Sequence, residues 1–199
     1  SSTFTGACAY SAFTDATPDD CGTGNSLGVG GNGVTASIGY AFDSGFSLAG
    51  GVSSTETAIM TKEGTDTYGI EAAYTADTYG VAVAYVSKDN AAAAETTYWG
   101  VNGFYDFDLA SISVGVETEE TSGVDKSGYF VGLSFPEVGP GSVNVGLATQ
   151  ANYKDSESEK LIYEASYSYP INDGMTITPG VYIKEASGSA DDDTGILAV

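Results

Sequence analysis

The chain lacks histidine, the side chain that most often serves as a general acid or base in enzymes. Its 199 residues include no histidine, and the six basic side chains are all lysine. Without histidine, a Ser-His-Asp or Cys-His site has no base, and a zinc site of the usual Cys/His type lacks ligands. An enzyme would have to act with carboxylates alone. We therefore predict that the protein is not an enzyme and uses no cofactor.

Acidic residues dominate the charge of the chain. Asp and Glu number 27, and the formal net charge is -21. A protein that binds nucleic acid needs basic patches to neutralise phosphates. We therefore exclude nucleic acid as a partner.

Two acidic clusters offer oxygen ligands of the kind that Ca²⁺ prefers. They are Asp191-Asp192-Asp193, the weak calcium candidates, and Asp155-x-Glu157-x-Glu159. Neither has the glycine and terminal glutamate spacing of an EF-hand loop. Solvated loop charge is the alternative interpretation. A variant of the calcium-binding interpretation is that divalent cations bridge these acidic loops to lipopolysaccharide phosphates.

The two cysteines, Cys8 and Cys21, lie in a Gly/Asp/Thr-rich stretch. Residues 1–33 as a whole are predicted to form an irregular N-terminal segment or loop. In an exported protein such a pair closes a surface loop as a disulfide. Two free thiols are the alternative.

The elements that must position the remaining side chains are strands. Five short turns, each bracketed by aromatic residues, lie within residues 40–46, 74–79, 105–109, 135–141 and 167–174. Longer polar connections alternate with them, at 55–65, 88–95, 119–126, 151–159 and 185–193. Strands are predicted at about 34–42, 46–54, 66–75, 79–87, 96–105, 109–118, 127–135, 142–150, 160–169, 175–184 and 194–199. Their length of about 9–10 residues is what a tilted strand needs to cross a bilayer.

The two faces of these strands differ in chemistry. One face is large and apolar, as in Ile38, Tyr40 and Phe42, whereas the alternate positions are mostly Gly, Ala and Ser. A soluble sandwich places its large residues inward and charged residues outward. A small polar face suits a water-filled lumen, and the apolar face would then contact lipid. In the strand at 96–105, the Trp99, Val101 and Tyr105 face competes with Tyr98 and Phe104.

This pattern predicts an all-β fold, a transmembrane antiparallel up-and-down β-barrel formed by the hairpins of residues 34–199. Eleven strands do not satisfy the even count of bacterial barrels. A further strand within 1–33 or in a segment outside this sequence would complete the number.

Five polar residues on the small face are candidates for lining the pore. They are Glu71, Asn102, Asn144, Glu164 and Lys184. Carboxylates at Glu71 and Glu164 would set a cation preference, with Lys184 as a basic counterpart. The alternative is that both glutamates lie near a rim and only solvate it.

Aromatic residues cluster beside the short turns and fit an interfacial girdle. The ordinary strand propensity of Tyr and Phe is the alternative explanation. The predicted girdle consists of Phe42, Phe46, Tyr74, Tyr79, Tyr105, Phe107, Phe135 and Tyr169.

The closing stretch resembles a known family. Residues 169–182 contain Tyr-Pro, an Asn-Asp-Gly turn and Thr-Pro-Gly-Val, followed by an acidic loop at 191–193 and a last strand. This order is similar to the last hairpin of cyanobacterial outer-membrane porins of the OprB type, which are carbohydrate-selective or associated with iron uptake. The resemblance implies that the chain is the C-terminal barrel portion of a longer porin in the cell outer membrane.

The expected function is passive diffusion of small hydrophilic solutes and inorganic ions, with a preference for cations. The expected partners are outer-membrane lipid, lipopolysaccharide and the permeating solutes, and a homotrimer is possible because many such proteins are trimers. A secreted acidic structural or adhesive β-protein of the cell surface is the alternative, since it shares the acidity and the Gly/Thr/Ala richness. Such a protein would pack its Tyr/Val face against protein rather than lipid.

Overall fold

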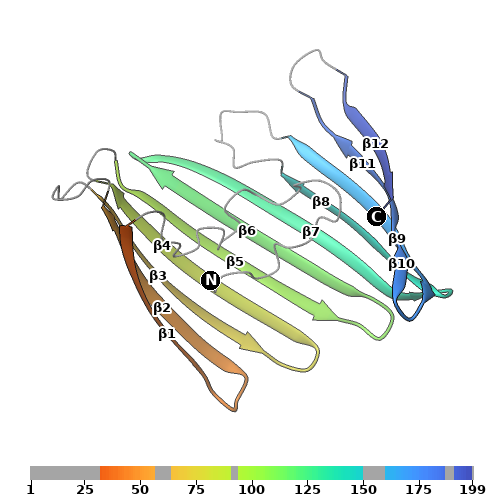
Figure 1. The fold of residues 1–199 in the computed structure, drawn as a ribbon, viewed down its shortest axis with the longest axis horizontal. Helices are drawn as coiled ribbons and strands as arrows, with labels where there is room; N and C mark the ends of the chain where they lie inside the picture. Colours follow the sequence, from red (N-terminus) through yellow and green to blue (C-terminus); the bar gives the residue numbers. More distant parts are fainter. Residues whose placement is uncertain (1–31, 57–63, 91–93, 150–159, 187–190, 199) are drawn as a thin grey trace.

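A single antiparallel sheet runs through the chain in the computed structural model, which describes residues 32–56, 64–90, 94–149, 160–186 and 191–198. Figure 1 shows this sheet curving strongly from β1 at one edge to β12 at the other. The strands are β1 (Asn32–Ala41), β2 (Phe46–Glu56), β3 (Gly64–Thr75), β4 (Tyr79–Asn90), β5 (Thr96–Asp106), β6 (Ser111–Thr121), β7 (Val124–Val138), β8 (Gly141–Thr149), β9 (Leu161–Asn172), β10 (Met175–Ile177), β11 (Pro179–Lys184) and β12 (Asp193–Ala198). The described residues contain no helix long and apolar enough to cross a membrane.

Each strand pairs with its neighbour in the sequence, which is the up-and-down arrangement predicted above. β10 and β11 together form one interrupted strand, because both pair with β9 in a common register: Ile177 opposes Tyr169 and Gly180 opposes Ser166. The interruption falls at Thr178, directly before Pro179, which has no amide hydrogen to donate to the ladder. Counting the pair as one strand, the predicted eleven strands are confirmed.

The two edges of the described sheet are β1 and β12. In an up-and-down sheet of eleven strands, the first and the last run in the same direction. Direct pairing of β1 with β12 would therefore be parallel. A purely antiparallel closure takes one further strand between them.

One predicted long connection is a tight hairpin. The interval 119–126 was predicted as a loop, but β6 ends at Thr121 and β7 begins at Val124. Ser122 has φ 56° and Gly123 has φ 74°, the two positive values that a type I′ hairpin turn requires. The ladder therefore extends through Glu119 and Lys126, which oppose each other.

The faces of the sheet are chemically inverted relative to a soluble protein. The large apolar side chains are on the more exposed face, with Ile38 80% exposed and Ile70 62% exposed. The opposite, inner face carries buried side chains among small residues, including Ala84, Val86, Phe130, Ala148 and Ile162. In β5, Trp99 is 45% exposed and Tyr98 only 9%, so the structure decides between the two competing faces of this strand, and the Trp99 face points outward.

Candidate functional site

The polar side chains predicted to have a function lie on the inner face. Residues directly opposite each other in a ladder share a face, so the pairing register shows which of them are neighbours. One row of the inner face joins Glu71 on β3 to Glu117 on β6. The pairing runs from Glu71 to Ala84, then to Gly100, and then to Glu117. Three steps of about 4.8 Å separate the two carboxylate-bearing residues, or about 14 Å along the wall. Between them the row contains only Ala84 and Gly100.

Glu164 lies in a second row, on β9. Its row contains Ser113, Gly132 and Gly146 on β6 to β8, and Tyr182 opposes Glu164 from β11. Glu164 is 7% exposed and Glu117 is 1% exposed, whereas Glu71 is half-buried. The three carboxylates therefore come from three different strands of the inner face.

The remaining pore-lining candidates are also on this face, and all three are partly exposed. Asn102 opposes Ala82 and Gly115. Asn144 opposes Ser134 on β7 and Ser166 on β9. Lys184 on β11 opposes Ile162 on one side and Asp193 on the other. All five sequence-predicted residues thus share one face, although they are spread around the sheet rather than gathered at one point.

Glu117 belongs to this set but was missed in the sequence. It continues the alternation of Ser113 and Gly115 along the inner face of β6. The alternation of side chains along the strand places Glu117 on the inner face. The strand is predicted to end at residue 118, however, and Glu117 is so close to that end that it was not assigned to either face from the sequence.

A mixed cluster occupies the inner face at the end of the sheet where the long connections lie. The Lys126 Nζ is 3.6 Å from the Glu119 Oε1. The Lys88 Nζ lies 5.2 Å from the centre of the Tyr98 ring, within cation–π range. The hydroxyls of Thr96 and Thr121 are 2.8 Å apart. Both lysines of this cluster therefore have a negatively charged or π-rich neighbour.

Aromatic rings on the inner face lie against glycines of the neighbouring strand. A Cβ atom added to Gly80 would overlap the ring of Phe104, and one added to Gly115 would overlap the ring of Phe130. Gly195 stands in the same relation to Tyr182. Each ring therefore rests against the wall over a position without a side chain.

The outer face carries the predicted aromatic residues beside the short turns. Their ring centroids are close in pairs, such as Phe42 and Phe46 at 5.7 Å, Tyr74 and Tyr79 at 5.8 Å, and Tyr105 and Phe107 at 4.7 Å. Phe107 is 57% exposed and Tyr169 is 41% exposed.

A second aromatic border of the outer face was not predicted from the sequence, although alternation assigns its tyrosines to the large apolar face. These residues each lie six positions along the strand from a member of the predicted girdle: Tyr68, Tyr85, Trp99, Tyr129 and Tyr163. Six residues span about 20 Å along a strand, or about 15 Å along the axis of a barrel whose strands tilt by about 40°. Mostly small or branched apolar residues fill the outer face between the two sets. The outer face is thus an apolar band with aromatic residues on both borders.

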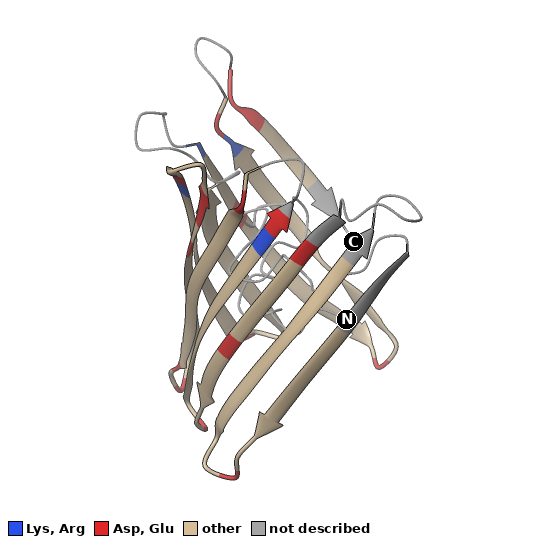
Figure 2. Ribbon diagram, turned by 90° about the vertical axis from the view of Figure 1, so that its left-hand side faces the viewer, with Lys and Arg blue, Asp and Glu red and all other residues tan. Residues whose placement is uncertain are grey.

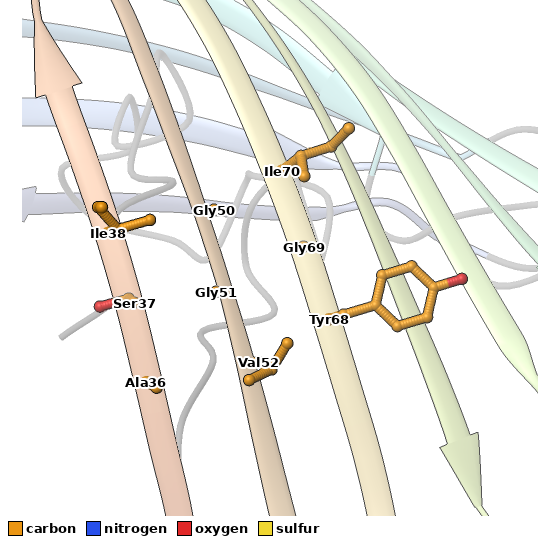
Figure 3. Close-up of a pocket in the computed structure, with 9 residues that line it drawn as sticks. All are labelled: Ala36, Ser37, Ile38, Gly50, Gly51, Val52, Tyr68, Gly69 and Ile70. Carbon is orange, nitrogen blue, oxygen red and sulfur yellow. The ribbon is translucent and has the colours of Figure 1, made fainter.

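The apolar band is not smooth. Gly50 points outward between Ile38 and Ile70, which oppose it in the ladder. These residues and Val52 border a shallow apolar groove over β1, β2 and β3. Figure 3 shows the bare backbone at Gly50, Gly51 and Gly69 between these side chains. Nothing polar except Ser37 and the Tyr68 hydroxyl borders the groove, so it offers contacts to hydrocarbon rather than to a polar ligand.

Charged residues gather toward the two ends of the strands, as Figure 2 shows. The short-turn end carries acidic residues alone among the described residues: Asp43, Asp77, Asp106, Asp108, Glu137 and Asp173. The opposite end carries both signs.

Two predicted features remain untested. Cys8 and Cys21, and with them the 1–33 segment up to residue 31, lie outside the described residues.

Within the described ranges, no three acidic side chains come close enough together to hold a metal ion. The Asp192 Oδ1 accepts a hydrogen bond of 3.0 Å from the Ala186 amide.

Three comparisons relate this chain to known proteins. The chain is similar to two solved structures, a KdgM porin in complex with disordered oligogalacturonate and a KdgM porin alone. Each has 11% sequence identity; the first has a TM-score of 0.39 over 78% of this chain and 84% of that chain, and the second 0.38 over 77% and 83%. A search of curated proteins found no match. The model of the Gram-negative porin family matches residues 2–191. This match covers almost the whole chain, and the apolar outer band and the small polar inner face of the sheet agree with it. The chain therefore belongs to the Gram-negative porin family and is located in the outer membrane.

Proposed function

We propose that this porin is a non-enzymatic, cation-preferring channel for the passive diffusion of small hydrophilic solutes and inorganic ions. The observation that carries the proposal is the half-buried Glu71 on the inner face, to which the more deeply buried Glu117 and Glu164 add negative charge from two other strands. Rings of carboxylates favour cations over anions in a wet pore. The net charge of -21 adds a negative potential at the mouths.

The inner-face lysines of the described residues lie near or opposite acidic or aromatic residues, which weakens their effect on this preference. Lys126 is 3.6 Å from Glu119, and Lys184 opposes Asp193 in the ladder. Lys88 lies over the Tyr98 ring. The local field of these lysines is therefore reduced at the long-connection end, while Glu71 faces a stretch of Ala and Gly.

The finer points of the proposal extend the resemblance in the closing hairpin. We propose that the chain is related to the OprB-type porins of cyanobacteria, with carbohydrates among the permeating solutes. A homotrimer embedded in lipopolysaccharide is the proposed assembly, and a Cys8–Cys21 disulfide closes the N-terminal segment. The apolar band with aromatic residues on both borders supports contact with lipid.

Planar-bilayer recording of the detergent-purified protein tests the function. We expect stepwise conductance and a reversal potential that shifts toward the potassium equilibrium potential under a KCl gradient. A reversal potential on the chloride side would contradict the cation preference. Folded and inserted protein without channel events would contradict the open channel.

A further inference from the structure

One row of the inner face carries an uncharged polar side chain on each of four consecutive strands. On β6 to β9, directly opposing residues form the row Ser111, Ser134, Asn144 and Ser166. We call these four residues the polar row. All four are partly exposed. On β1 to β4, the row at a comparable position reads Ala41, Ser47, Ala73 and Ala82.

The polar row is continuous, because its members are direct ladder neighbours. Consecutive strands are about 4.8 Å apart, so the four side chains extend over about 14 Å. Each hydroxyl is both a donor and an acceptor, and the Asn144 amide supplies two donors and an acceptor. A solute moving along this row meets a new hydrogen-bonding group at each strand.

The neighbouring row keeps the approach to these groups free of large side chains. It places Gly132 directly between Ser113 and Gly146. The Phe104 ring lies toward Gly80 on β4, and the Tyr182 ring lies toward Gly195 on β12. Both rings of this row thus point away from the glycines beside the polar row. Glu164 stands at the β9 border of the glycines.

We propose that the polar row determines specificity for solutes that carry several hydrogen-bonding groups. Such a solute loses part of its hydration shell in a pore, and wall hydroxyls replace the lost hydrogen bonds. The alanine-rich part at the comparable position on β1 to β4, namely Ala41, Ser47, Ala73 and Ala82, offers a single hydroxyl. The proposal rests on the proposed channel, but it is independent of the cation preference, since the four side chains are uncharged.

The test compares two solutes of similar size in swelling assays of proteoliposomes. Erythritol carries four hydroxyls, whereas glycine betaine has no hydrogen-bond donor. The variant is Ser134→Ala with Asn144→Ala, in which both new side chains are smaller, so a slower rate has no steric cause. Ser47→Ala removes one hydroxyl from the alanine-rich part and serves as the control.

We expect the double variant to slow erythritol by about five-fold or more, which corresponds to one net hydrogen bond of about 1 kcal/mol. Glycine betaine should keep its rate within about two-fold, and Ser47→Ala should leave both rates unchanged. Heat-modifiable mobility in gels establishes that the variants are folded. An unchanged erythritol rate, or an equal loss for both solutes, would overturn the proposal. Native protein that passes neither solute would overturn the channel itself.

Discussion

Neutralising Glu71 should reduce the cation preference of the channel without closing it. Glu71 is half-buried on the inner face of β3, and its ladder neighbours are Ala49 and Ala84. The substitution Glu71→Gln keeps the size and the hydrogen-bonding capacity of the side chain but removes one charge. Asp66→Asn is the matched control, because Asp66 is on the same strand and exposed on the opposite face.

The expected size of the effect follows from Coulomb's law. A hydrated cation about 5 Å from the carboxylate in bulk-water dielectric gains about 0.8 kcal/mol. At 0.1 M salt the Debye length of about 10 Å lowers this gain to about 0.5 kcal/mol. The same term disfavours an anion, so the permeability ratio of K⁺ to Cl⁻ should fall by up to about five-fold. At 1 M salt the Debye length is about 3 Å, and the change should be less than about two-fold.

Glu117 lies too far away to mask the substitution. The ladder separates Glu71 from Glu117 by about 14 Å. This distance exceeds the Debye length of about 10 Å at 0.1 M salt. Neutralisation of the two residues should therefore act almost additively on the logarithm of the permeability ratio.

Reversal potentials under a KCl gradient, recorded at 0.1 M and at 1 M salt, measure the effect. The reasoning is refuted if Glu71→Gln leaves the ratio unchanged at 0.1 M. It is equally refuted if Asp66→Asn lowers the ratio as much, because the charge of the whole protein, rather than the inner face, would then set the preference.

Three further predictions follow from other parts of the molecule. The single tryptophan, Trp99, is 45% exposed on the outer face, so brominated lipids should quench most of its fluorescence; a spectrum insensitive to them would place Trp99 away from lipid. Gly115→Ala should lower the free energy of unfolding, measured in urea, by about 1–3 kcal/mol, since its Cβ would overlap the Phe130 ring, and Phe130→Leu should restore the loss; a stabilised single variant would contradict this packing. Cys8 and Cys21 should resist alkylation until a reductant is added, and mass spectrometry that finds both thiols labelled in unreduced protein would disprove the disulfide.

Local patterns in the sequence determined most of the architecture. Period-two alternation places Ile38 and Tyr40 on one face and Ser37 and Gly39 on the other, whatever the partner strands are. Turn residues mark the hairpins, so strand number and order follow along the chain. The apolar outer face and the presence of Glu71 on the inner face are therefore readable without coordinates.

The pairing register was decided only by the tertiary structure. Register depends on which residues of two strands meet, and alternation constrains it only to within steps of two. The row from Glu71 to Glu117 requires the correct register of β3, β4, β5 and β6 together. Ser134, Asn144 and Ser166 are likewise separate polar residues in the sequence and become one row only in the sheet. Side-chain direction across the sheet, such as the Phe130 ring over Gly115, also depends on that register, because a ring can rest only over a glycine that the neighbouring strand presents to it.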